Sequence, residues 1–219
     1  MSTYPTSKLL FEQVIFGAEN RASLNLSLNN SDPSLTAGMS QGARIVGPGS
    51  ILTLLIPVVT LIAAVWSGSL LLLNYVHVLT GGTWTGVDLF MGLVMSRVLR
   101  GLRPDVRAEF IKKLVPIMLF FMPALASVAI TAGVYLATWE GRDFYSLPIV
   151  AAGVIAIILT AQGFGLILPN ELRIFRELRK QQPDIQKVIK LGMRNIYISG
   201  SQSIFQIALI AVMAYLAVG

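Results

Sequence analysis

The 219-residue sequence contains no cysteine and only one histidine, His77. The lack of cysteine excludes disulfides, iron–sulfur clusters, thiolate-held metals and cysteine nucleophiles. A single histidine cannot supply the three histidine ligands of a zinc site or both axial ligands of a haem. The sequence also lacks a glycine-rich nucleotide motif and a serine–histidine–acid set. We therefore expect no independent catalytic activity.

Charged residues are also scarce, at 13% of the sequence, whereas hydrophobic residues make up 54% and the mean hydropathy is +0.70. Soluble domains carry about a quarter charged residues. The composition excludes an ordinary soluble domain, a disordered protein and a nucleic-acid-binding module. It predicts an integral membrane protein that has the lipid bilayer as its surroundings.

Five apolar segments have about the 20 residues that a helix needs to cross the hydrocarbon core. They predict an all-α, polytopic integral membrane helical bundle over residues 45–219, with spans at about 45–66, 70–96, 114–139, 147–168 and 196–218. Residues 1–44 form a polar tail. Within this tail, Leu9–Phe16 has the pattern of a short amphipathic helix.

The basic residues predict the orientation of the bundle. Six of the 17 lysines and arginines lie between Arg97 and Lys113, and seven lie between Arg173 and Arg194. Cytoplasmic loops carry such an excess, so the tail and N-terminus are expected in the cytoplasm and the C-terminus outside. The net charge of +6 then reflects topology rather than a nucleic-acid partner. Residues 170–195 are expected to lie on the inner membrane surface.

Polar side chains inside a bilayer are costly and point to function. The second predicted span carries three of them, Asn74, His77 and Asp88. They share one face of a helix, with alternating spacings of three and four residues. The full stripe is Asn74, His77, Gly81, Trp84, Asp88, Met91 and Met95. His77 and Asp88 are separated by roughly 16 Å along the axis, so they can line one path but cannot touch.

Two interpretations of this stripe stay open. Asp88, Asn74 and His77 could relay protons or ions, or could form hydrogen bonds between helices. His77 could ligate haem iron or copper, with Met91, Met95, Met118 or Met122 as thioether ligands, or these methionines could pack in the core. In the same span, Gly82 and Gly86 form a G-x-x-x-G motif, which predicts close helix contact.

The segment Tyr75–Gly86 places a histidine seven residues before a Trp-x-Gly sequence, and Thr131–Leu136 follows in a later apolar segment. These features, within residues 69–140, resemble the copper-resistance D (CopD) group and the opening helix of HemJ-type protoporphyrinogen oxidases. The resemblance implies a helical bundle in which His77 binds haem b or copper and Trp84 lies at the cofactor site. Leu89–Gly92 stands where HemJ proteins have Tyr-Leu-Pro-Arg.

Three functions remain as hypotheses. The first is a CopD-like membrane protein that binds haem b or copper through His77. The second is a non-catalytic accessory subunit of a larger membrane complex, such as a respiratory or electron-transfer complex, with other membrane subunits as partners. The third is a proton or ion transporter that uses Asp88 and His77.

Overall fold

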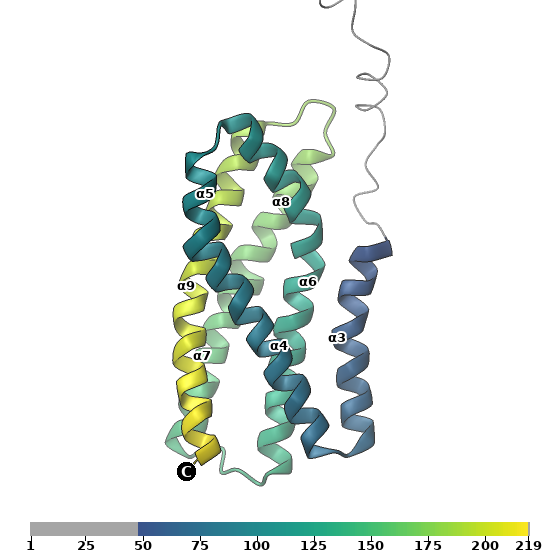
Figure 1. The fold of residues 1–219 in the computed structure, drawn as a ribbon, viewed down its shortest axis with the longest axis vertical. Helices are drawn as coiled ribbons and strands as arrows, with labels where there is room; N and C mark the ends of the chain where they lie inside the picture. The colour runs from purple at the N-terminus through teal and green to yellow at the C-terminus, as the bar shows by residue number, and fades with distance from the viewer. Residues whose placement is uncertain (1–47, 219) are drawn as a thin grey trace, which may run out of the picture. The chain divides into compact units, whose positions relative to one another are not determined.

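The computed structural model describes residues 48–218, with side chains described from Leu52 to Val218. The predicted polar tail and the helix at Leu9–Phe16 lie outside these residues. The described part is helical and contains no strand, which confirms the all-α class (Figure 1). Its elements are α3 (Pro48–Ser67), α4 (Leu70–Phe90), η1 (Met91–Met95), α5 (Ser96–Gly101), α6 (Pro104–Trp139), α7 (Leu147–Gln162), η2 (Gly163–Ile167), α8 (Leu168–Leu178) and α9 (Ile185–Val218).

Several of these elements join into long rods that can cross a membrane. Four such rods occur among the described residues: Leu70–Gly101, Pro104–Trp139, Leu147–Leu178 and Ile185–Val218. A shorter apolar helix, Leu52–Ser67, precedes them. Large apolar side chains such as Leu71, Ile157 and Ile204 point outward, as a bilayer requires. The chain is an integral, multi-pass membrane protein.

The rods are longer than the predicted spans, and the difference is greatest at residues 170–195. This segment does not form a separate helix on the membrane surface. Its first part is α8, which continues α7, and its last part begins α9. Ile174 and Val188 are fully buried and pack against Ile111 and Val115 of α6. The apolar face expected to meet the membrane is therefore covered by the extended start of α6.

The turns between the rods follow from local sequence. Gly68 has a φ of 64°, which other residues rarely adopt, and it separates α3 from α4. Ser69 then caps α4, because its side chain accepts a hydrogen bond from the Leu72 N–H. Pro104 occupies the first turn of α6, where a missing N–H costs nothing. The chain thus reverses direction at short connections.

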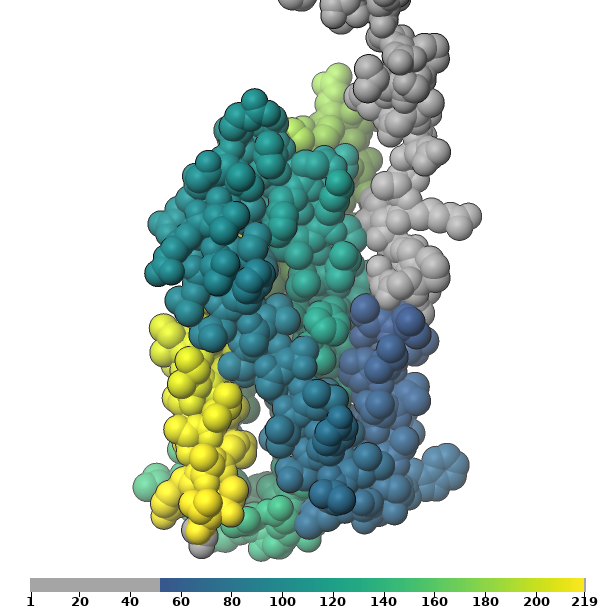
Figure 2. All heavy atoms as spheres, in the orientation of Figure 1, coloured from purple at the N-terminus to yellow at the C-terminus, as the bar shows by residue number. Residues whose placement is uncertain are grey.

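The rods pack unevenly around their common interior. Helix α4 packs against α6 and α9, α3 packs on the outside of α4 and α6, and α7 and α8 pack against α9. In contrast, the backbones of α6 and α7 lie farther apart, and these helices meet through side chains such as Leu125 and Leu159. On the face shown in Figure 2, a hollow separates the C-terminal part of α9 from the N-terminal part of α4. The bundle is therefore tight at some helix pairs and open at others.

The tightest crossing joins η1 to α9. A Cβ atom added at Gly200 would lie 3.0 Å from the Gly92 Cα, and one added at Gly92 would collide with the Gly200 backbone. The turn containing Gly92 is a π-helix, in which the Ser96 hydroxyl donates to the Gly92 carbonyl. The added residue of a π-turn rotates the next turn of the helix, so Ser96 is buried while Met95 is only half-buried.

The second π-turn has a different cause. It ends just before Pro169, which has no N–H and whose ring crowds the carbonyl of the preceding turn. The helix accommodates the proline by widening through Gly163–Ile167 and then continues as α8. Both π-turns therefore lie within the membrane-spanning rods rather than at their ends.

Replacing Gly92 with alanine should destabilise the bundle by about 1–3 kcal/mol, the usual range for overpacking. The added methyl group has only the Gly200 backbone to displace. Thermal unfolding of the purified protein in detergent, followed by circular dichroism, measures the effect. Gly82→Ala is the matched control, because nothing lies within 4 Å of its added Cβ. Equal unfolding temperatures for the two variants would contradict the close crossing.

Candidate functional site

A cavity lies inside the bundle, between α4, α6, the α7–α8 rod and α9. It encloses about 850 Å³ between atoms, including space that is open to the exterior. The wall contributed by α6 is entirely apolar, from Ile111 to Ala126. The opposite walls carry polar side chains, namely Asp88 of α4, Glu171 of α8, and Asn195, Ser199 and Gln202 of α9.

Asp88 is the most deeply buried of these groups, with no exposed surface. Its Oδ2 atom accepts a hydrogen bond of 2.9 Å from the Gln206 side-chain amide. Its Oδ1 atom is buried and has no partner among the described residues. The Ser199 and Trp84 side chains lie beside the carboxyl group. One oxygen is therefore held by Gln206, and the other is buried without a hydrogen bond to the described residues.

Glu171 is the second carboxyl group of the cavity. It lies in the first turn of α8, shortly after Pro169, and is 6% exposed. It is near enough to Asp88 for the two charges to repel each other. No hydrogen bond or ion pair involving the Glu171 side chain occurs within residues 48–218. The two acids thus share one cavity, although 83 residues separate them in the sequence.

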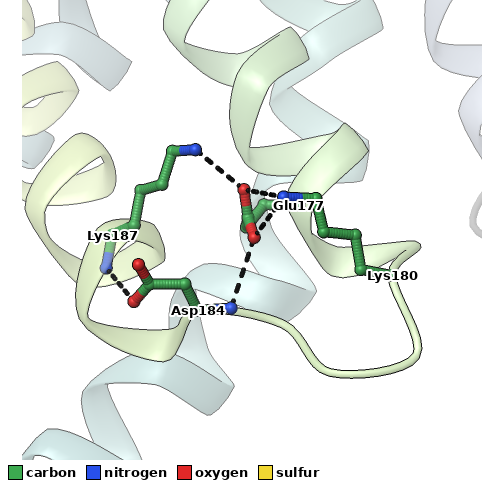
Figure 3. Close-up of polar contacts among 4 residues, drawn as sticks. All are labelled: Glu177, Lys180, Asp184 and Lys187. Atoms are coloured by element: carbon green, nitrogen blue, oxygen red, sulfur yellow. Dashed lines mark hydrogen bonds and ion pairs between the residues drawn. The ribbon is translucent and has the colours of Figure 1, made fainter.

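A third buried acid, Glu177, has basic partners, unlike Asp88 and Glu171. Glu177, near the end of α8, accepts bonds from the Lys180 and Lys187 ammonium groups at 2.8 and 2.9 Å (Figure 3). The backbone N–H of Asp184 also donates to it at 3.3 Å. These contacts fix the turn between α8 and α9. Two bases therefore compensate Glu177, which is what an ionised carboxylate in a buried place requires.

Asp88 and Glu171 have no such compensation. No lysine, arginine or histidine is among the described residues that line their cavity. Removing an ion from water costs several kcal/mol even after relaxation. A hydrogen bond between membrane helices returns about 0.6 kcal/mol on average, so the bond from Gln206 cannot offset that cost. A carboxyl group in such a place stays neutral by keeping its own proton, and it ionises only where another cation compensates its charge.

Helix α9 supplies the polar groups that hold the surrounding helices together. The Asn195 amide donates to the Ile167 carbonyl at 3.2 Å and accepts a bond from Asn170 at 2.9 Å. The Gln202 amide donates to the Leu159 carbonyl at 3.0 Å. Together with the hydrogen bond from Gln206 to Asp88, these bonds join α9 to α4, α7, η2 and α8. Of the two acids, only Asp88 takes part in these bonds, through Gln206.

His77 lies outside this cavity. Its Nδ1 atom is 2.8 Å from the Ala129 carbonyl oxygen, and its ring packs against Gly133, where a Cβ would lie 2.9 Å from Cε1. A carbonyl can only accept, so Nδ1 carries the proton and the neutral ring keeps its lone pair on Nε2. This bond ties α4 to α6. It also leaves Nε2 in the form that binds metals.

The other predicted site residues divide between two places. Trp84 and Met91 line the acid cavity together with Met118 and Met122, whereas Met95 and Asn74 do not line it. Asn74 is exposed. On one rod, His77 and Met91 are about 21 Å apart along the axis. The histidine and this methionine therefore cannot ligate one metal ion together.

Glu171 and Asn195 are the functional candidates that sequence reasoning missed. Both fall in the segment expected on the membrane surface, beyond the predicted ends of the spans. The sequence does contain a pattern that indicates Asn195. It is the first of four polar residues on one helix face, with spacings of four, three and four: Asn195, Ser199, Gln202 and Gln206. That stripe extends from the basic segment into the last apolar span, and all four residues are buried.

Comparison with protein-family models, curated proteins and solved structures finds no match for this chain. The resemblance to CopD and HemJ proteins therefore stays a prediction.

Proposed function

We propose that this membrane protein binds and relays a cation, with the Asp88 and Glu171 carboxyl groups as the binding groups. The observation that carries the proposal is the pairing of two buried acids in a cavity lined by no described base. The unpartnered Asp88 Oδ1 atom adds a free acceptor. This proposal modifies the transporter hypothesis: the second ionisable group that acts with Asp88 is Glu171 rather than His77.

The chemistry of the cavity favours a proton or an organic cation over a bare metal ion. Calcium requires six to eight oxygen ligands, and magnesium keeps several waters. The polar lining consists mainly of two carboxyl groups, the Ser199 hydroxyl and the amides of Asn195 and Gln202. Gln202 and Asn195 already hold backbone carbonyls of the neighbouring rod. A proton needs one oxygen only, so it is the simplest occupant.

Infrared spectroscopy of the protein in lipid tests the protonation. A protonated carboxyl group has a C=O stretching band that an ionised group lacks. We expect such a band to disappear as the pH is raised, with Asp88→Asn and Glu171→Gln each removing part of it. In proteoliposomes, proton flux should be lost in Asp88→Asn. Asparagine can still accept the bond from Gln206, so the fold should persist.

Glu177→Gln is the matched control, since it removes a buried carboxyl group on α8 that lies outside the cavity. It should leave both the band and the flux unchanged. A wild-type protein with no titrating carboxyl band would overturn the proposal.

For the orientation, we propose a cytoplasmic N-terminus and an external C-terminus. The basic residues gather at one end of the rods, whereas Trp66, Trp139 and Tyr145 lie at the other end, where an aromatic belt belongs (Figure 1). The cysteine-free sequence makes the test direct. An impermeant maleimide added to cells should label Tyr145→Cys and should reach Gln181→Cys only after lysis. The reverse pattern would contradict the orientation.

A second candidate function is haem binding at His77, which the Nδ1 bond to Ala129 favours. When bound there, haem would supply electron transfer, and this chain would contribute Nε2 as one axial ligand. Protein purified in mild detergent should then show a reduced-minus-oxidised haem spectrum that His77→Ala abolishes. A colourless wild-type protein, or a spectrum unchanged by the substitution, would reject this candidate.

A further inference from the structure

The acid cavity has an open side between α6 and α7. The backbone of α6 comes close to α3, α4, α8 and α9, whereas α6 meets α7 only through side chains, in the cluster around Leu159. The lining on this side comes from Met118 and Met122 of α6 and from Thr160 and Phe164 of the α7–α8 rod. Thr160 is exposed, and so is Phe164, at 41%. These positions are near the middle of their rods, so the opening faces acyl chains rather than water.

The walls of the cavity differ in character. Helix α6 offers an apolar strip, while α4, α8 and α9 offer the two carboxyl groups and the amides. A ligand that fits both walls has an aliphatic part and a polar part. No described base lines the cavity, so the two ionised acids would select a ligand whose polar part is positively charged. A neutral or negative polar part would leave the charge of the acids uncompensated.

The free acceptor on Asp88 indicates the kind of cation. Its Oδ1 atom is fully enclosed and makes no hydrogen bond within the described residues. A primary ammonium group carries three N–H donors. One donor can bond to Asp88 Oδ1, and the same positive charge offsets the charge of Glu171 in the shared cavity. Such charge-assisted bonds are stronger than those of a neutral donor.

We propose that the opening between α6 and α7 admits a membrane-dissolved amphiphilic amine, which binds with its ammonium group between Asp88 and Glu171 and its aliphatic chain along α6. This inference rests on the proposed cation function of the same acid pair and names the organic substrate class. The bilayer supplies the ligand directly, so no aqueous entrance is needed.

Tryptophan fluorescence provides the test. Trp84 lines the cavity, whereas Trp66 and Trp139 lie at the ends of helices, so a full-length Trp66→Phe/Trp139→Phe protein reports on the cavity alone. The probe is dodecylammonium brominated near its ammonium group, because bromine quenches tryptophan at short range. The matched probe is dodecanol brominated at the same carbons. In lipid nanodiscs, the amine should quench saturably, and the alcohol should quench only in proportion to its amount in the bilayer.

Variants connect the signal to the acids and to the opening. Asp88→Asn and Glu171→Gln should each weaken amine binding by about tenfold or more, as loss of one buried charge partner does. Glu177→Gln should bind as the parent protein does. Thr160→Phe narrows the opening and should slow the onset of quenching without removing the carboxyl band.

Several outcomes would overturn the inference. Equal quenching by the amine and the alcohol would mean that the cavity does not select an ammonium group. Unchanged binding in both acid variants would mean that the amine lies elsewhere. An unchanged rate in Thr160→Phe would reject entry between α6 and α7. If a titrating carboxyl band is present but the amine does not bind, the proposed proton function survives and only this inference fails; if neither is seen, both fail.

Discussion

Inside the bundle lie two carboxyl groups that have no basic partner among the described residues. In a hydrocarbon environment, an uncompensated charge costs more than any single hydrogen bond returns. Hydrogen-bond donors around these acids come from α9. The Gln206 amide donates to Asp88, and the Ser199 side chain lies beside the same carboxyl group. Glu177 differs, because the Lys180 and Lys187 ammonium groups compensate its charge and fix the turn between α8 and α9. The difference separates an acid compensated by two lysines from two acids with no base among the described residues that line their cavity.

The cavity exists because helix packing around these acids is unequal. The contact of Gly92 with Gly200 brings the backbones of η1 and α9 close together, whereas α6 and α7 meet only through longer side chains. Both π-turns border the cavity, through Met91 on one side and through Gly163, Phe164 and Ile167 on the other. A π-turn changes which residues face inward, so these two irregular turns help to decide what lines the space.

His77 and the acid pair represent two separate places in the fold. The histidine joins α4 to α6 through Ala129 and keeps a free Nε2 atom, whereas the acids face a cavity that His77 does not line. Haem binding and cation binding are therefore independent hypotheses, and either can hold without the other. The accessory-subunit hypothesis stays a prediction, because it concerns other chains.

The sequence alone determined the membrane class, the all-α fold and the candidacy of Asp88, because composition and span length depend on local residue content. The alternating spacing also placed Trp84, Asp88 and Met91 on one face, and all three line the cavity. The helix ends could not be placed this way, since Ile174 and Val188 become buried only through contact with α6. The pairing of Asp88 with Glu171 joins positions 83 residues apart, and no local pattern encodes such a distance. Only tertiary packing decided that pairing, the exclusion of His77 and the open side between α6 and α7, because each depends on which helices touch.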